Sequence, residues 1–354
     1  MESHGADIYT ASRISGIHED SIIDFSSNIN PLGIPESVEI AAMNSIKNAN
    51  RYPDINSREL TEAIAASEHV PSEWIFVSNG AAEAIFRIAF YLKPGKGLVT
   101  APTFSEYENS LKLSGTDVDV YNLCEKNNFK INHDVLKSID NTDIVFLCNP
   151  NNPTGQITDS STVVKIADHC KKNNAVLVVD ECFLDFVENK EKYSIVNKLQ
   201  EYDNLIVLKA FTKIYAIPGI RLGYCMCSNK QLIRGLKSSG PPWNVSTIAQ
   251  AAGIAALKEK EYVKKSVDYV KIQREYLVYE LQKINIKTYE SHANYVFLKT
   301  DILQLKQKLL KKGILIRDCS NYRNLSENYY RIAVKSEHEN KLLIQKLKEI
   351  TGMQ

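Results

Sequence analysis

The sequence predicts an α/β protein with one large domain and one smaller domain, and three observations support this class. Short apolar runs at 143–148, 176–179 and 205–208 have the length and composition of buried strands. Helical patterns lie between such runs, which is the order typical of α/β folds. The chain has 354 residues, enough for two hydrophobic cores. A long helical pattern at about 247–283 is therefore interpreted as the connection between the two domains.

Composition excludes several classes of partner. Lys+Arg 43 against Asp+Glu 42 gives a net charge of +1, so no global field attracts nucleic acid or a membrane, and we expect a small-molecule substrate. The 7 cysteines have the spacing of neither a zinc site nor a disulfide framework, which predicts no metal and a reducing compartment. No apolar run approaches the ~18 residues of a membrane helix, and no signal peptide begins the chain, so we expect a soluble, cytoplasmic protein.

The first fifty residues break from a short apolar start at 22–25 into a loop at 26–33 that is marked by proline and glycine. Such a loop is either a linker or a segment laid against a site, and composition does not choose between the two. Ser57 is predicted to begin a capping box, with Glu59 behind it, that starts a helix extending to about residue 67.

A strand at 74–77 leads through a run of mostly small residues, 78–83, into a helix at 84–91. The free N–H groups at such a helix start can bind a phosphate. The run is not a Walker loop and no G-x-G-x-x-G motif occurs, so nucleotide binding is disfavoured. Phe104 follows the next strand, at 97–100. An aromatic residue there either stacks on a planar ring or, more commonly, packs in the core.

Two further strands end in polar residues. The strand at 143–148 ends in the turn Asn149-Pro-Asn-Asn-Pro-Thr-Gly155, which offers spare side-chain amides. After a helix at about 160–173, the strand at 176–179 ends at Asp180. A carboxylate behind four apolar residues is costly unless a cation pairs with it, and a protonated pyridine nitrogen is one such cation. The alternative is that Asp180 caps a loop or pairs with a structural arginine.

The strand at 205–208 delivers Thr212 and Lys213, and Arg221 follows between two apolar residues. Two cations this close to apolar neighbours are unfavourable unless an anion lies between them. A lysine in this setting has a depressed pKa and can form a Schiff base, while an arginine offers a fork for phosphate. Together they indicate pyridoxal phosphate. The alternative is that Lys213 is a solvated loop lysine.

The last third of the chain predicts a compact α/β domain. Strand patterns lie at 293–298, 314–317 and 329–334, with helices at 302–312 and 337–351. Arg317 and Arg331 each follow or interrupt a strand pattern. Either could be a surface residue, but the two together suggest an anionic ligand.

At this point the motifs resemble a known family. Phe104 behind Pro102, the turn 149–155, Val179-Asp180-Glu181, and Thr212-Lys213 with Arg221 are similar to the pyridoxal-phosphate enzymes of aspartate-aminotransferase fold. The order and spacing cover nearly the whole chain. Within that fold the chain resembles the histidinol-phosphate aminotransferase branch of the class I/II aminotransferases, and most closely its phosphothreonine decarboxylases of cobalamin biosynthesis. His4-Gly5, residues 24–33 and Pro242-Trp243 carry this closer resemblance.

The resemblance implies the transferase fold of type I, with a mostly parallel seven-stranded sheet in a large domain. It implies a segment at 1–45 that belongs to the small domain and the site entrance, a pyridoxal-phosphate-binding domain at 46–245, and a small α/β domain at 246–354. A homodimer with shared active sites is also implied.

Residue roles follow from the same resemblance. Lys213 would hold the cofactor and later move protons, and Asp180 would pair with the ring nitrogen. Asn152 would donate to the ring's phenolic oxygen, and Phe104 would stack on the ring. The residues implied around the cofactor phosphate are Gly80, Ala81, Ala82, Thr212, Arg221 and, from the second subunit, Tyr52. Those implied for substrate carboxylate, substrate phosphate and the entrance are Arg317, Arg331, His4 and Asn28.

Two departures bear on the reaction. Related aminotransferases usually carry a tyrosine where this chain has Phe183, so one donor to the ring oxygen is missing. Residues 5–7 read Gly-Ala-Asp where the decarboxylases tend to read Gly-Gly-Asn, which bears on the substrate. We predict decarboxylation of phosphothreonine, with phosphoserine as a close variant. The alternatives are histidinol-phosphate transamination and, in another class, a regulatory module that binds the cofactor without turnover.

Overall fold

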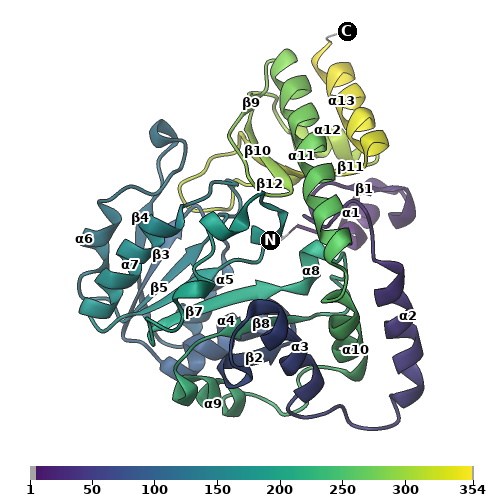
Figure 1. Cartoon of the computed structure of the whole chain (residues 1–354). Coiled ribbons are helices and arrows are strands. Elements are labelled where there is room, and N and C mark those ends of the chain that lie inside the picture. The colour runs from purple at the N-terminus through teal and green to yellow at the C-terminus, as the bar shows by residue number, and fades with distance from the viewer. Residues whose placement is uncertain (1–4, 353–354) are drawn as a thin grey trace.

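A seven-stranded sheet forms the centre of the larger part of the molecule (Figure 1). In this computed structural model, which describes residues 5–352, the spatial order is β2-β8-β7-β6-β5-β3-β4. β8 runs antiparallel to both of its neighbours, and the other adjacent pairs are parallel. The bounds are β2 (Ile75–Ser78), β3 (Lys96–Ala101), β4 (Asp117–Asn122), β5 (Ile144–Cys148), β6 (Val176–Asp180), β7 (Leu205–Ala210) and β8 (Gly223–Met226).

Helices cover both faces of this sheet, and the strand side chains alternate between them. In β5, Val145 and Leu147 pack in one core, whereas Ile144 and Phe146 pack in the other. Burial on both faces is the reason such strands are continuous apolar runs. The helices of this part are α3 (Arg58–Glu68), α4 (Gly80–Leu92), α5 (Glu106–Leu113), α6 (Val135–Ile139), α7 (Ser160–Lys172), α8 (Phe211–Ile214) and α9 (Lys230–Ser238).

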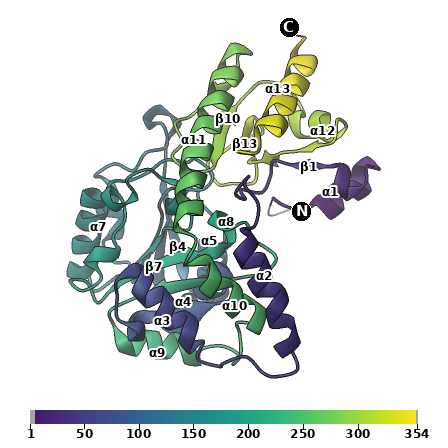
Figure 2. The ribbon, with the colours of Figure 1, turned by 45° about the vertical axis from the view of Figure 1, so that its right-hand side comes forward.

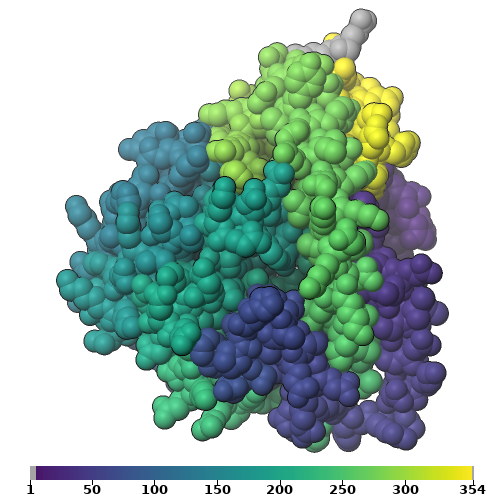
Figure 3. Space-filling view, in the orientation of Figure 1, coloured from purple at the N-terminus to yellow at the C-terminus, as the bar shows by residue number. Residues whose placement is uncertain are grey.

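A four-stranded antiparallel sheet, β12-β13-β10-β9, and a two-stranded parallel sheet, β1-β11, form the smaller part. The β1-β11 pair brings the amino-terminal segment against the carboxyl-terminal one (Figures 2 and 3). The bounds are β1 (Ile23–Asp24), β9 (Lys287–Thr288), β10 (Tyr295–Lys299), β11 (Ile314–Leu315), β12 (Arg317–Asp318), β13 (Tyr329–Ala333), α1 (Ile8–Ser15), α11 (Lys260–Lys283), α12 (Leu305–Leu310) and α13 (Glu337–Thr351). The predicted α/β class is confirmed.

The hydrophobic cores bear on how the chain divides into domains. Val38 of α2 (Glu36–Ser45) and Ala249 and Ala252 of α10 (Thr247–Ala256) pack in a core of the large sheet. Helices α2 and α10 lie side by side in both ribbon views (Figures 1 and 2). The boundaries at residues 45 and 245 remain predictions. This packing favours a second boundary in the short break between α10 and α11.

Three local predictions are wrong. Residues 247–283 form two helices, because α10 packs on the large-sheet core while α11 continues into the second core. Ser57 makes no side-chain cap and has φ 46°, and the carboxylate of Asp54 accepts from the N–H of Arg58 instead, at 2.8 Å. The strand predicted at 314–317 is divided between two sheets, since β11 pairs with β1 and β12 pairs with β13.

Candidate active site

A cavity of about 470 Å³ opens at the carboxyl ends of three neighbouring strands of the large sheet. Cys148, Asp180 and Ala210, the last residues of β5, β6 and β7, line it. Residues of the amino-terminal loop and of the start of α4 also line it, and Arg317 and Arg331 reach it from the four-stranded sheet. Ligands of open α/β sheets bind in this position.

An anion cup, which we define as Gly80, Ala81, Ala82, Thr212 and Arg221, lies at the start of α4. The helix begins at Gly80 with φ 73°, a conformation that favours glycine. A Cβ at this residue would lie 2.8 Å from Nη2 of Arg221, so the guanidinium packs directly against the helix start. Arg221 has no ion pair among residues 5–352. The free N–H groups of the helix and this guanidinium together suit a phosphate.

Lys213 lies beside the cup on the short helix α8, directly after β7. Its Nζ is 5.9 Å from the centroid of the Phe183 ring, and no carboxylate in the described part of the chain pairs with it. Burial, together with the charges of Arg331 and Arg221, lowers the pKa of Lys213 to about 8. Such an amine is a far better nucleophile near neutral pH than an ordinary lysine.

Asp180 also lines the cavity, and its carboxylate is held by two donors. The hydroxyl of Tyr107 donates to its Oδ2 at 2.6 Å, and the N–H of Cys182 donates to its Oδ1 at 2.9 Å. Tyr107 is fully buried and stacks on Phe146 with ring centroids 5.1 Å apart. Burial, and then the charge of Asp180, raises the pKa of Tyr107 well above its usual value, so the phenol remains a donor. The carboxylate is therefore fixed in orientation, with no cation paired to it within residues 5–352.

Asn152 is oriented by Arg331. The guanidinium donates through Nη1 to Oδ1 of Asn152 and through Nη2 to the carbonyl of Ser26 at 2.7 Å. With its oxygen occupied, Asn152 presents its amide N–H groups as donors. Nε of Arg331 and Oδ1 of the buried Asn28 have no hydrogen-bond partner. Buried polar atoms in this state are expected to bind a ligand or water.

Arg317 and Arg331 are directly opposite each other in the antiparallel pair β12–β13. Both are buried, with 6% and 5% exposure. Like charges at opposite positions of a ladder repel, and the repulsion is strong away from water. Arg317 donates to Asn321 at 2.9 Å and lies over the ring of Tyr322, which lines the same cavity. An anionic ligand would relieve this repulsion.

Two phenylalanines provide the flat apolar surfaces of the cavity. Phe104 is half-buried and meets Tyr107 edge to face, with ring centroids 5.6 Å apart. Phe183 also lines the cavity and meets Tyr295 edge to face at 5.1 Å. The side chain at position 183 has no hydroxyl, so it offers no hydrogen-bond donor to a ring bound in this part of the cavity.

The structure brings most of the predicted site residues to one cavity. Those that line it are Asn28, Ala81, Ala82, Phe104, Asn152, Asp180, Thr212, Lys213, Arg221, Arg317 and Arg331. Gly80 lies directly behind Arg221. Tyr52 does not line it; this side chain is 78% exposed and stacks on Trp243 at 4.5 Å. His4 lies outside the described residues. The individual roles given to all these residues remain predictions.

Sequence reasoning missed Tyr107 and Tyr322 as site residues. Tyr107 follows Phe104 by three residues, a spacing that puts both side chains near one helix start, and this is the signal that was available. Nothing in the sequence around Tyr322 indicates that Arg317 packs over its ring.

The departure at residues 5–7 has a structural explanation. The carboxylate of Asp7 accepts from the N–H of Thr10 at 2.9 Å and so caps α1. Gly5 and Ala6 line the cavity, whereas Asp7 does not. The added negative charge therefore serves the helix and does not point into the cavity.

These residues fit pyridoxal phosphate by their chemistry. To a phosphate, the cup offers N–H groups and the guanidinium of Arg221, which in the described chain donates only to the carbonyl of Pro218. Lys213 offers an amine of lowered pKa, and Asp180 offers an oriented carboxylate. Phe104 offers a flat apolar face for the ring. The excess of cations in the cavity agrees with a ligand that carries negative charge.

Comparison with known proteins identifies the family. Residues 20–347 match the family model "Aminotransferase class I and II". The chain therefore belongs to the class I and II aminotransferases, a family that uses pyridoxal phosphate as its cofactor. Threonine-phosphate decarboxylase of Salmonella typhimurium is 35% identical over 99% of this chain and 97% of its own length.

Two further relatives bear on the branch. The adenosylcobalamin biosynthesis bifunctional protein CobDQ of Leptospira interrogans is 34% identical over 97% of this chain and 40% of its own length. The crystal structure of histidinol-phosphate aminotransferase from Clostridium acetobutylicum has a TM-score of 0.87 at 33% identity, covering 93% of this chain and 98% of that one. Within residues 5–352, no helix combines the length and apolar character needed to cross a bilayer.

Proposed function

We propose that this chain is a pyridoxal-phosphate-dependent carboxy-lyase. It converts L-threonine O-3-phosphate to (R)-1-amino-2-propanol O-2-phosphate and carbon dioxide in cobalamin biosynthesis, with O-phosphoserine as a close variant substrate. The observation that carries the proposal is the pair Arg317 and Arg331, two buried cations opposite each other at the cavity. One small molecule that carries both a carboxylate and a phosphate would bind both guanidinium groups. The names of the Salmonella and Leptospira relatives support the same substrate and pathway.

The cofactor would be held by residues at each end of the cavity. The anion cup would bind its phosphate, Asp180 would pair with its ring nitrogen, Asn152 would donate to its ring oxygen and Phe104 would cover its face. Lys213 would be its covalent attachment. When bound, pyridoxal phosphate supplies an electron-withdrawing ring that stabilises negative charge at the substrate's α-carbon.

The protein decides which bond at that carbon breaks by fixing the substrate's orientation. Anchoring the substrate phosphate and carboxylate on Arg317 and Arg331 would turn the carboxylate out of the ring plane, where its bond is weakened. Lys213 would then return a proton to the α-carbon in place of the lost carbon dioxide. With a pKa of about 8, its amine exchanges protons readily near neutral pH.

The runner-up is histidinol-phosphate transamination, which the similarity to the Clostridium structure favours. Histidinol phosphate carries a phosphate but no carboxylate, so it offers an anionic group to only one of the two arginines. The test is to give the purified holoenzyme phosphothreonine, phosphoserine, or histidinol phosphate with 2-oxoglutarate. Carbon dioxide released from phosphothreonine without any keto acid supports the lyase. Glutamate formed from 2-oxoglutarate with histidinol phosphate, together with no carbon dioxide from either phosphorylated amino acid, rejects it.

We further propose a cytoplasmic homodimer in which the partner subunit's Tyr52 reaches the anion cup. Tyr52, Ile55 and Trp243 are exposed apolar side chains on one part of the surface, and a second subunit would cover them. The test is to mix inactive Lys213→Ala and Tyr52→Ala proteins under conditions in which dimers exchange subunits. Recovered activity supports shared sites, and no recovery with demonstrated mixed dimers contradicts them.

A further inference from the structure

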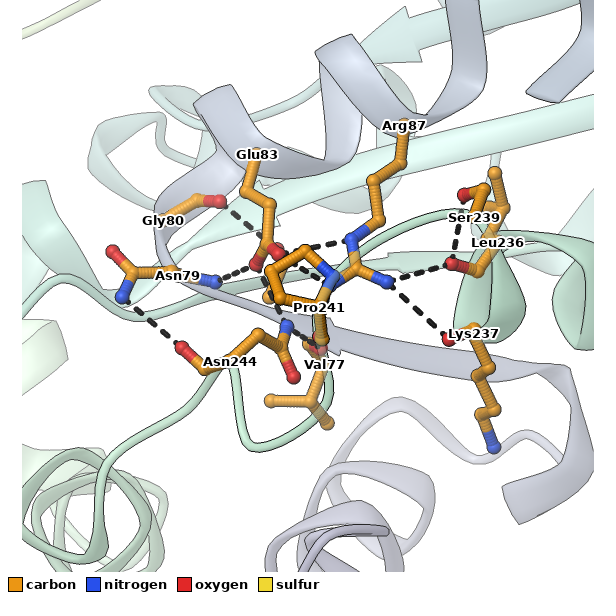
Figure 4. A network of polar contacts seen from close by, with 11 residues as sticks. Val77, Asn79, Gly80, Glu83, Arg87, Leu236, Lys237, Ser239, Pro241 and Asn244 are labelled. Atoms are coloured by element: carbon orange, nitrogen blue, oxygen red, sulfur yellow. Dashed lines mark hydrogen bonds and ion pairs between the residues drawn. The ribbon is translucent and has the colours of Figure 1, made fainter. Parts of the chain in front are cut away.

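A buried arginine braces the helix that begins at the anion cup. Arg87 of α4 is 5% exposed, and its Nε and Nη2 donate to Oε1 of Glu83, one turn earlier, at 2.9 and 2.6 Å (Figure 4). Its Nη1 donates to the carbonyl of Leu236 at 3.0 Å, and its Nη2 donates to that of Pro241 at 2.9 Å. One side chain therefore ties α4 to the end of α9 and to the loop at 239–244.

The second oxygen of Glu83 closes the turn that precedes the helix. Oε2 accepts from the backbone N–H of Asn79 at 2.6 Å and from Nδ2 of Asn244 at 2.7 Å (Figure 4). Asn244 also donates to the carbonyl of Val77 at 3.3 Å, and Nδ2 of Asn79 donates to the carbonyl of Asn244 at 3.1 Å. The end of β2 and the first residue before α4 are thus held from one side by a single loop residue.

This arrangement leaves the cup open to a ligand. Asn79 is the N-cap residue of α4, yet its side chain makes no capping bond and binds Asn244 instead. The N–H groups that an N-cap side chain would satisfy stay available. Gly240 allows the guanidinium of Arg87 to pack against the loop at 239–244, because a Cβ at this residue would lie 2.4 Å from Cζ of Arg87.

We propose that Glu83, Arg87 and Asn244 are positioning residues for the phosphate end of the cofactor. None of the three lines the cavity described above. They fix the β2–α4 turn so that the N–H groups of residues 80–82 converge with Arg221 on one anion. Because Trp243, next to Asn244, stacks on Tyr52, the same loop also couples the cup to the surface proposed as the subunit interface. The inference rests on the proposed placement of the cofactor phosphate.

The test compares two ligands that differ only in the phosphate. Apoenzyme is titrated with pyridoxal phosphate and with pyridoxal, and binding is followed by absorbance. Asn244→Ala is expected to weaken pyridoxal phosphate about tenfold, equivalent to ~1.4 kcal/mol, and to leave pyridoxal unchanged. Asn244→Asp, which places a carboxylate beside Glu83, is expected to weaken it further.

Asn173→Ala is the matched control, since Asn173 is also half-buried and donates to a backbone carbonyl, but at the far end of α7. It should change neither affinity. If Asn244→Ala lost affinity equally for pyridoxal phosphate and pyridoxal, or lost affinity for neither, the inference would be overturned. Thermal melting of the apo variants shows whether each is folded. A wild-type protein that does not prefer pyridoxal phosphate over pyridoxal would instead contradict the proposed cofactor site.

Discussion

Lys209 and Lys213 come from one short segment and have opposite electrostatic surroundings. Lys209, in β7, is 4% exposed, and its Nζ lies 3.1 and 3.0 Å from the two oxygens of Glu68 and 3.9 Å from Glu181. Burial opposes its charge, but Glu68, Asp185 and Glu181 more than offset burial, so the pKa of Lys209 is raised. Lys213 has burial and two arginines acting in the same direction, and its pKa is lowered to about 8.

The difference separates a structural ion cluster from a functional one. The charge of Lys209 is neutralised by ion pairs with Glu68 and Glu181. The hydroxyl of Tyr224 also donates to Glu68, at 2.6 Å. Around Lys213, neither Arg221 nor Arg331 forms an ion pair with a carboxylate within residues 5–352, although both line the same cavity as Asp180. A site that keeps uncompensated charge at a cost in stability is a site prepared for a ligand of opposite charge.

The largest expected effect is on catalysis. Lys213→Ala should lower kcat on the order of 10⁴-fold, because it removes both the proposed cofactor attachment and the group that moves protons. The melting temperature of the apo variant should not fall, since an uncompensated cation is removed. Activity within tenfold of the wild type would reject the assignment.

For the other lysine the large effect is on folding. Lys209→Met leaves Glu68 and Glu181 buried without their cation, so the free energy of unfolding should fall by about 3–5 kcal/mol. Denaturant titration measures this, and kcat per folded molecule should be unchanged. Adding Glu68→Gln should recover part of the loss. If Lys209→Met were as stable as the wild type, the cluster of Lys209, Glu68 and Glu181 would contribute nothing to the free energy of unfolding.

A smaller effect is expected where a neutral group orients a charged one. Tyr107→Phe removes the hydroxyl that donates to Asp180 and leaves the ring packing in place. Activity should fall by about 10- to 100-fold, which corresponds to the free energy of one hydrogen bond to a charged acceptor. The cofactor absorbance and its pH dependence should also shift, which a packing defect alone would not produce. Normal spectra with normal activity would remove Tyr107 from the site.

The last expected effect is a difference in pH dependence. The folded pKa of Lys213 lies at about 8 against an ordinary 10.5, so above pH 8 the unfolded chain binds more protons and stability rises with pH. Apo Lys213→Met should therefore be more stable than wild type at pH 7 and lose this advantage towards pH 10. Lys209 has a raised pKa, so its stabilising effect should persist over the same range. Parallel curves for the two Met variants would contradict the comparison.

Local sequence predicted the buried strands well and the exposed or divided elements poorly. β5 and β7 are buried on both faces, and their apolar runs stand out in the sequence. β4, an edge strand, alternates charged and apolar residues and was not predicted. Asp54 and Ser57 are both good capping residues, and in the structure the carboxylate of Asp54 accepts from the N–H of Arg58 while Ser57 makes no side-chain cap. These failures share one cause, which is that tertiary packing selects among local options of similar energy.

The site shows the same limit. The motifs around Asp180 and Lys213 are recognisable because a strand end and its polar residues are adjacent in the chain. The hydrogen bond between Arg331 and Asn152 joins residues 179 positions apart, and the opposition of Arg317 and Arg331 depends on strand register. Sequence patterns contain neither of these distances, so the orientation of Asn152 and the paired anion site required the structure.

The most direct measurement is to reduce the holoenzyme with borohydride and map the modified peptide by mass spectrometry. A lysine joined to pyridoxal phosphate becomes permanently labelled. The contrast between the two lysines predicts the full label on Lys213 and none on Lys209. A label on Lys209, or a protein that takes up no label after incubation with the cofactor, would contradict it.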